Sequence, residues 1–127
     1  MSSRPLASAV AEPFRGDAVV DDRTIRAELS GIADLRATTA LEKLLLSLHT
    51  EALKAQIDEI VVDVCRLEFL SSSCVLKIVG WLGRRDESLA TYKVRFICTT
   101  RHHWQQRSLH ALRAFAPDAL TIETRRE

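Results

Sequence analysis

The sequence contains no long apolar segment. None of its 127 residues belongs to a run near the ~20 apolar residues that cross a membrane. The N-terminal segment MSSRPLASAVAEPF lacks the continuous apolar core of a signal peptide. Cysteine is scarce, and Cys65, Cys74 and Cys98 are odd in number and lack C-x-x-C spacing, which is typical of free thiols in a reducing cytoplasm. We therefore expect a cytoplasmic protein that does not insert into membranes.

A large excess of one charge is also missing. Lys and Arg number 18 and Asp and Glu number 17, which gives a formal net charge of +1. From Gly80 onward the chain is mildly basic, but it lacks the clustered Lys/Arg stripe of a nucleic-acid-binding protein. We expect a solvated surface or an acidic partner there, and no nucleic acid.

Motifs for catalysis are absent. The chain has no G-x-x-x-x-G-K phosphate loop and no G-x-S-x-G nucleophile elbow. None of the cysteines is followed by the arginine that a thiol phosphatase carries six residues later. His102 and His103 are adjacent, a spacing that rarely lets two side chains chelate one ion, and no second ligand cluster stands near them. We expect no enzyme activity, no cofactor and no metal.

What the sequence does contain is typical of one globular domain, with 46% hydrophobic and 28% charged residues. Residues 1–16 hold Pro5, Pro13 and several small residues, which predicts a flexible N-terminal leader. The domain itself is then expected to span residues 17–127.

Periodic patterns predict the first half of that domain. Residues 18–20 and 24–29 are expected to pair as a short hairpin. Asp34 stands at an N-cap position ahead of a helix that extends to about residue 56. Its apolar residues share one face: Leu41, Leu44, Leu45, Leu48 and Ala52.

Strands and helices then alternate to the end. Residues 60–70 begin with a β-branched run typical of a strand covered on both faces. Residues 92–98 and 119–124 are further expected strands. Two more helices are expected, one with Val75, Leu76, Val79 and Leu82 on one face, the next with Trp104, Ser108, Ala111, Leu112 and Phe115. This order predicts a layered α/β fold, a mixed sheet of about four or five strands against about three or four helices.

The segment EFLSSSCVLK places three serines where a strand ends and a helix begins. One interpretation is structural, because serine is a favoured N-cap worth roughly 1 kcal/mol. The other is regulatory, because a helix N-terminus accepts an anion and a phosphate there would change the surface strongly. The residues themselves leave both interpretations open.

The run IVVDVCRLEFLSSSC resembles, without a gap, the signature of the STAS family of sulphate transporters and anti-sigma factor antagonists. In that pattern an apolar strand carrying Asp leads to a hydrophobic pair and then to Asp-Ser-Ser-Gly opening a helix. Asp63 falls on the strand aspartate, and Ser71-Ser72-Ser73-Cys74 falls on the Asp-Ser-Ser-Gly. Upstream, LSGIADLRATTALEKLL is similar to the family's Gly-Glu-Leu-Asp segment, which places Asp34 beside the serines.

The resemblance implies a regulatory binding module. In such proteins a serine kinase, often the anti-sigma factor itself, phosphorylates a serine of the pair, and a phosphatase reverses the modification. Ser72 is then the expected phosphorylation site, with Ser71 as second choice and also as the expected helix cap. The expected partner-binding residues are Asp34, Ser71, Ser72, Ser73, Lys77 and Trp81. For Trp81 the alternative is a packing residue.

Two departures from the family pattern keep a second function open. Ser71 replaces the family's aspartate, and Cys74 replaces its glycine. The alternative is a STAS-like structural subunit of a larger signalling or membrane-associated assembly, without a switch, and a homo-oligomer is compatible with either function. Cys74 itself is either a redox-sensitive thiol at a helix N-terminus or an inert buried one.

Overall fold

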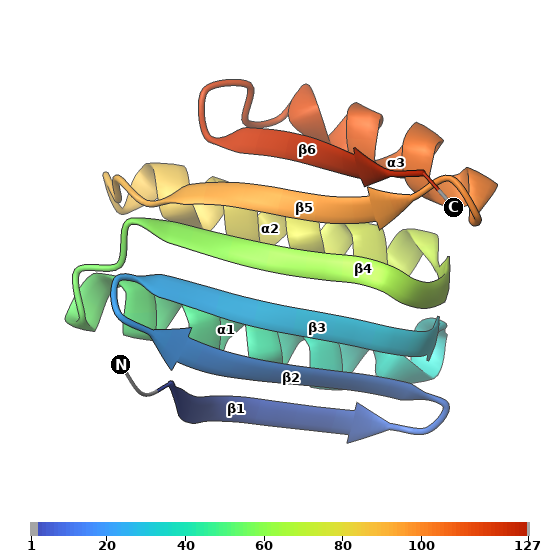
Figure 1. Cartoon of the computed structure of the whole chain (residues 1–127), viewed down its shortest axis with the longest axis horizontal. Helices are drawn as coiled ribbons and strands as arrows, with labels where there is room; N and C mark the ends of the chain where they lie inside the picture. Colours follow the sequence, from blue (N-terminus) through green and yellow to red (C-terminus); the bar gives the residue numbers. More distant parts are fainter. Residues whose placement is uncertain (1–2, 127) are drawn as a thin grey trace.

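A mixed sheet and three helices make up the described part of the chain, residues 3–126 of the computed structural model (Figure 1). Its strands are β1 (Arg4–Ala11), β2 (Phe14–Asp21), β3 (Thr24–Ala33), β4 (Glu59–Leu70), β5 (Lys93–Thr99) and β6 (Leu120–Arg125). Its helices are α1 (Thr38–Lys54), α2 (Ser72–Glu87) and α3 (His103–Arg113), with a 3-10 helix η1 (Leu35–Ala37) ahead of α1. None of the helices in residues 3–126 is long and apolar enough to span a bilayer.

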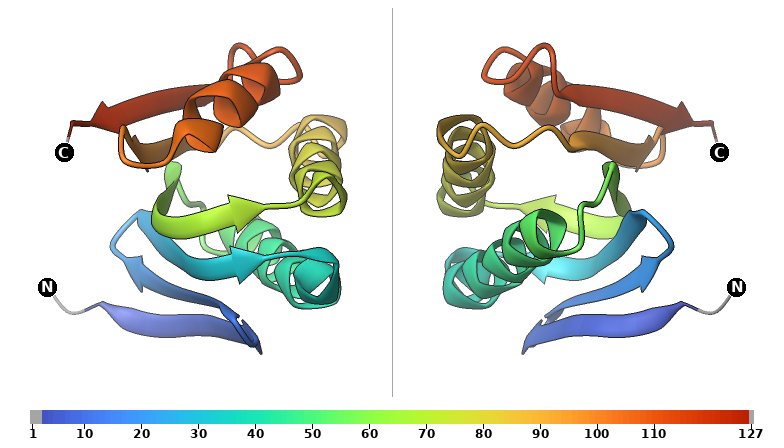
Figure 2. Two further views of the ribbon diagram at one scale, coloured as in Figure 1. Left: turned by 90° about the vertical axis from the view of Figure 1, so that its right-hand side faces the viewer. Right: turned by 90° about the vertical axis from the view of Figure 1, so that its left-hand side faces the viewer.

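The six strands lie in the sheet in the order in which they occur along the chain. β1, β2 and β3 pair antiparallel, as hairpins allow, whereas β3, β4, β5 and β6 pair parallel and are joined through α1, α2 and α3. All three helices cover the same face of the sheet (Figure 2), which is the result of successive crossovers of one hand. The expected α/β fold with a mixed sheet is confirmed, with one strand more than expected.

The additional strand corrects the expectation of a flexible leader. Within residues 1–16, the described part forms β1 and the start of β2, while residues 1 and 2 lie outside the described residues. Arg4 of β1 forms an ion pair with Glu51 of α1, and Pro13 lies in the turn between β1 and β2. Alternate small residues of β1 pack against the core: Ala7, Ala9 and Ala11. The expected domain boundary at residue 16 therefore falls inside β2.

The hydrophobic core lies between the sheet and the helices. α1 buries all four predicted leucines, Leu41, Leu44, Leu45 and Leu48. The other face of the sheet carries no helix among residues 3–126, so the expectation that β4 is covered on both faces is wrong (Figure 2). Val61 and Ile97 are nevertheless buried on that open face, within a surface that includes Arg26, Glu28 and Arg125.

The buried face of α3 differs from the one that periodicity predicted. Trp104 is half-buried and Ala111 and Phe115 are exposed, whereas Gln105, Leu109 and Leu112 are buried. Gln105 can be buried where an apolar residue is expected because both its amide nitrogen and its amide oxygen form hydrogen bonds. Its Nε2 donates to the carbonyls of Val64 (2.6 Å) and Leu67 (3.1 Å), and its Oε1 accepts from the Thr99 N–H (2.8 Å). This side chain attaches α3 to the second half of β4 and to the end of β5.

Gly31 positions the end of β3. Its φ of +83° lies in the left-handed region, and a Cβ at this residue would approach the Pro13 carbonyl oxygen to 1.7 Å. The neighbouring Ile32 N–H donates to the same carbonyl (3.2 Å). Only glycine fits there, and the turn between β1 and β2 is thereby attached to β3 just before Asp34.

A buried histidine connects α1 to the far end of α2. His49 is 5% exposed; its Nδ1 lies 2.8 Å from the Tyr92 hydroxyl and its Nε2 lies 3.2 Å from Ser88 Oγ. Because Ser88 donates to the Arg84 carbonyl (2.7 Å), its oxygen accepts from Nε2–H, and the Tyr92 hydroxyl donates to Nδ1. Burial and the nearby Arg84 charge lower the pKa of His49, and burial raises the pKa of Tyr92 to about 12. Both groups are therefore neutral at neutral pH in the folded protein.

We predict that His49 makes folding pH-dependent. Its pKa is lower in the folded chain than in the unfolded one, so its stabilising contribution is complete above the ordinary pKa of 6.5 and is lost as pH falls below it. Replacing His49 with Gln should reduce the change in the free energy of unfolding between roughly pH 7.5 and pH 5, measured by urea denaturation. The matched control is His103→Gln on the exposed surface, and an unchanged pH dependence in His49→Gln would contradict the assignment.

Candidate functional site

The serine segment lies at the edge of the sheet where the three helices begin. β3 ends at Ala33 and β4 ends at Leu70, and these two residues are partners in the parallel register. The Ser71 N–H donates to the Ala33 carbonyl (2.8 Å), which holds the two strand exits together. Asp34 and the serines are therefore neighbours, as the sequence predicted.

Ser71 is the N-cap of α2, as expected. Its backbone is extended (φ −70°, ψ 160°), and its Oγ accepts from the Cys74 N–H (3.3 Å). The Ser71 carbonyl accepts from the Val75 N–H (2.9 Å), which begins the helical ladder. The first hydroxyl of the three is thus occupied by a structural hydrogen bond.

Ser72 is the first residue of α2 and is exposed, whereas Ser73 is half-buried. Within residues 3–126 neither hydroxyl forms a hydrogen bond to another residue. The Ser72 hydroxyl therefore combines exposure with a position at the positive end of the helix dipole. Among the three serines it is the one best placed for a modifying enzyme to reach.

Asp34 caps η1 and is balanced by Arg36. The Arg36 N–H donates to Asp34 Oδ1 (2.9 Å), and the Arg36 guanidinium donates to Oδ2 (2.8 Å). The guanidinium holds the pKa of the Asp34 carboxyl below its ordinary value, so this group is a carboxylate at neutral pH. Sequence analysis missed Arg36, although the spacing Asp-Leu-Arg at the start of a helix was a usable signal.

Cys74 is buried beneath the serine segment and contacts the backbone of Asp34. Its side chain is fully buried, and its Sγ donates to the Asp34 carbonyl (3.5 Å). A buried thiol in this contact is not exposed to oxidants in solution, which favours the inert thiol over the redox-sensitive one. Within residues 3–126 no three His, Cys, Asp or Glu side chains gather as a metal site.

The structure corrects the expectation that Trp81 faces a partner. Trp81 is 4% exposed and belongs to the core, because the buried face of α2 is formed by Cys74, Ile78, Trp81 and Leu82. Lys77 does reach the surface, where it forms an ion pair with Glu42 of α1 (3.0 Å). This pair borders a groove of about 330 Å³ between α1 and α2.

Exposed apolar side chains near the serines were missed. Leu76, expected on the buried face of α2, is 68% exposed, one turn along the helix from Ser72. Leu35 directly follows Asp34 and is 72% exposed, and Phe69 at the end of β4 is 47% exposed. We call Leu35, Phe69 and Leu76 the apolar collar. Each of them belongs to a segment at the edge of the sheet where the helices begin, and exposed large apolar side chains at such a place are candidates for a protein-binding surface.

The fold and this site define a small α/β domain with a helix-capping serine loop between exposed apolar residues. No protein-family model and no curated protein matches the sequence. Among solved structures the chain is similar to an anti-sigma factor antagonist from Mycobacterium paratuberculosis, with a TM-score of 0.67 and 13% sequence identity over 91% of this chain and 89% of that chain. The resemblance drawn from the serine segment is thereby confirmed for the fold.

We predict that Ser71 and Ser72 differ in their effect on stability. Ser71→Ala removes the cap and should lower the free energy of unfolding by about 1 kcal/mol. Ser72→Ala removes an exposed hydroxyl without a partner and should change it by less than about 0.5 kcal/mol. Urea denaturation of both variants provides the comparison. Equal losses, or a larger loss for Ser72→Ala, would show that the cap is misassigned.

Proposed function

We propose that this chain is a regulatory binding protein similar to anti-sigma factor antagonists, which captures a protein partner and releases it when Ser72 is phosphorylated. The observation that carries the proposal is the division of roles in the serine loop. Ser71 is used as the cap, so Ser72 stands free and exposed on the first turn of α2. The likeness in fold to an anti-sigma factor antagonist supports it.

The proposed partner surface consists of the apolar collar and the polar groups between and beside its members. Leu35, Phe69 and Leu76 supply apolar contact area, and Lys77 and the Asp34–Arg36 pair supply directional polar contacts. Interfaces of this kind derive most of their affinity from a few buried apolar anchors surrounded by polar residues. The surface binds rather than catalyses, and the free thiols fit a reducing cytoplasm.

Phosphate on Ser72 would act on the surface and not on the fold. It adds about −1.5 to −2 charges at neutral pH, which the N-terminus of α2 accommodates favourably. Arg36, already hydrogen-bonded to Asp34 at this end of the molecule, limits the repulsion from that carboxylate. The partner, however, would meet a dianion beside the apolar collar. Burying this charge without a countercharge is costly, so the complex dissociates.

We predict that the cognate serine kinase phosphorylates Ser72 in the presence of ATP. Mass spectrometry identifies the phosphorylated residue. Ser72→Ala should keep partner binding and Ser72→Asp should lose it, while both variants retain the wild-type thermal midpoint. Thr50→Asp, at an exposed residue of the last part of α1, is the control for added charge and should keep partner binding. No phosphate on any of the three serines, together with equal binding by the Ser72 variants, would instead support the non-switching structural subunit.

We also predict that Leu76 is an anchor of the partner surface. Leu76→Asp should weaken partner binding at least about tenfold, because one lost anchor costs upward of 1.4 kcal/mol. The free energy of unfolding should change by less than about 0.5 kcal/mol, since this side chain is exposed. Partner binding is measured by isothermal titration calorimetry. The control is Leu89→Asp, which changes an exposed leucine beyond the other end of α2 and should leave partner binding unchanged. Equal loss in both variants would place the binding surface elsewhere.

A further inference from the structure

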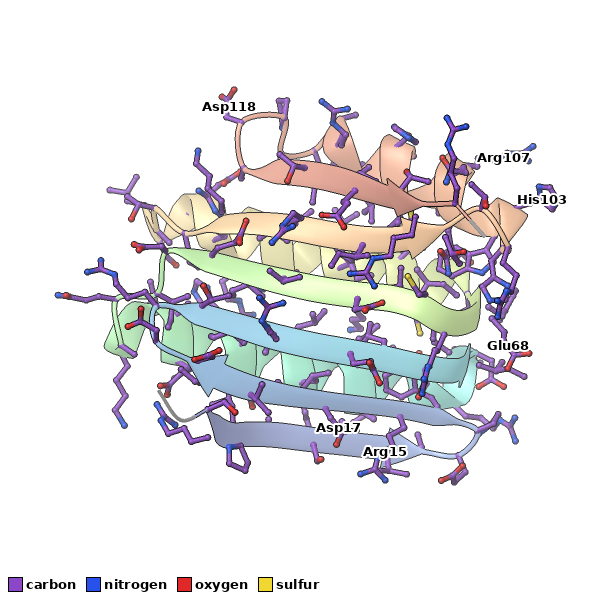
Figure 3. All side chains as sticks on the ribbon, viewed as in Figure 1. Arg15, Asp17, Glu68, His103, Arg107 and Asp118 are labelled. Carbon is purple, nitrogen blue, oxygen red and sulfur yellow. The ribbon has the colours of Figure 1, made fainter. Side chains whose placement is uncertain are left out.

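The exposed ionisable side chains of α3 are all basic. His103, Arg107, His110 and Arg113 are its only ionisable side chains, and all four are exposed. His103, Arg107 and His110 follow the spacing i, i+4, i+7, which places them in one stripe along the helix, with Arg113 beside it. Figure 3 shows His103 and Arg107 pointing away from the body of the molecule. We call these four residues the basic stripe.

The basic stripe gathers unpaired basic side chains on one helix, whereas many arginines elsewhere in the described residues are paired with carboxylates. Ion pairs with carboxylates are formed by Arg4, Arg15, Arg23, Arg36, Arg85, Arg95 and Arg125. No side chain of the basic stripe has an ion pair or hydrogen bond with another residue in the described part of the chain. A protein with a formal net charge of only +1 thus carries two unpaired arginines and two histidines, and no acidic residue, on the exposed side of one helix.

The exposed side of α3 excludes insertion into a lipid surface. A helix that binds membranes does so with its apolar face, but the apolar residues of α3, Leu109 and Leu112, are 1% exposed and packed in the core. Phe115, just past the helix, is a large apolar side chain exposed near the stripe. Apart from this single phenylalanine the attraction to a membrane would be electrostatic, and such binding needs more cations than the stripe provides.

Nucleic acid fits the stripe poorly as well. Neutralising a phosphate backbone requires several Lys or Arg side chains along one track, and the stripe contains two arginines and no lysine. Carboxylates match better, because arginine binds them in a bidentate geometry and histidine donates a hydrogen bond to them. Ala111 and Ala114, small and exposed beside the stripe, allow a partner backbone to approach closely.

We propose that the basic stripe of α3 binds an acidic segment of a protein, with carboxylate side chains aligned along His103, Arg107 and His110. The stripe lies on α3, whereas the proposed serine switch lies on η1 and α2. Loss of one function would leave the other intact, so the two proposals can be tested separately.

The experiment measures binding of a fluorescein-labelled peptide of ~12 glutamates, long enough to cover α3, to the full chain by fluorescence anisotropy. Wild type should bind at about 50 mM salt and weaken at about 300 mM, where exposed charges are screened. Arg107→Glu/Arg113→Glu should weaken binding at least about tenfold. The control Arg26→Glu/Arg84→Glu reverses two exposed arginines elsewhere, with the same change in net charge, and should stay within about twofold of wild type.

Several results would overturn the proposal. One is that the wild-type chain does not bind the peptide at low salt. Another is that both double variants lose binding equally, which would show that binding depends on net charge and not on the basic stripe. Tighter binding of a DNA duplex, or of phosphatidylserine vesicles, that requires Arg107 and Arg113 would assign the stripe to that ligand instead. Circular dichroism checks that each variant is folded, and Arg107→Gln/Arg113→Gln replaces the charge reversal if it is not.

Discussion

The parallel pairing of β3 with β4 is the interaction on which the rest of the molecule depends. Parallel neighbours cannot be joined by a tight turn, so the chain must cross over through a helix, and α1 is that crossover. Repeating the same step for β5 and β6 stacks all three helices on one face and starts each of them at the same edge of the sheet. The register of Ala33 with Leu70 then places Asp34 beside Ser71.

Ordinary helix capping divides the three serines into different roles. Ser71 satisfies a backbone N–H at the start of α2, and Cys74 fills the space beneath and bonds to the Asp34 carbonyl. Ser72 is left without an internal partner. Arg36 compensates Asp34, so the unmodified loop presents nearly balanced charge. A single phosphate would therefore change the electrostatic character of this end while leaving its hydrogen bonds in place.

Two surface features differ from the ion pairs that many charged side chains of the described residues form. On the open face of the sheet Arg95 pairs with both Glu59 and Glu123. The apolar collar departs from this pattern by exposing large side chains, and the basic stripe of α3 departs from it by leaving cations unpaired. The two proposed binding surfaces would therefore take different partners, one with an apolar surface and one with an acidic segment.

The sequence by itself determined the elements whose patterns are local. The leucines of α1, the alternation in β5 and the cap at Ser71 follow from spacing and side-chain chemistry alone. The tertiary structure decided which side chains are buried where residue spacing allows more than one face. Periodicity cannot place polar Gln105 in the core, because only the free carbonyls of Val64 and Leu67 make that burial favourable. Nor can it show that Trp81 is buried and Leu76 exposed, or that residues 4–11 add a strand, since each outcome depends on which surface another element covers.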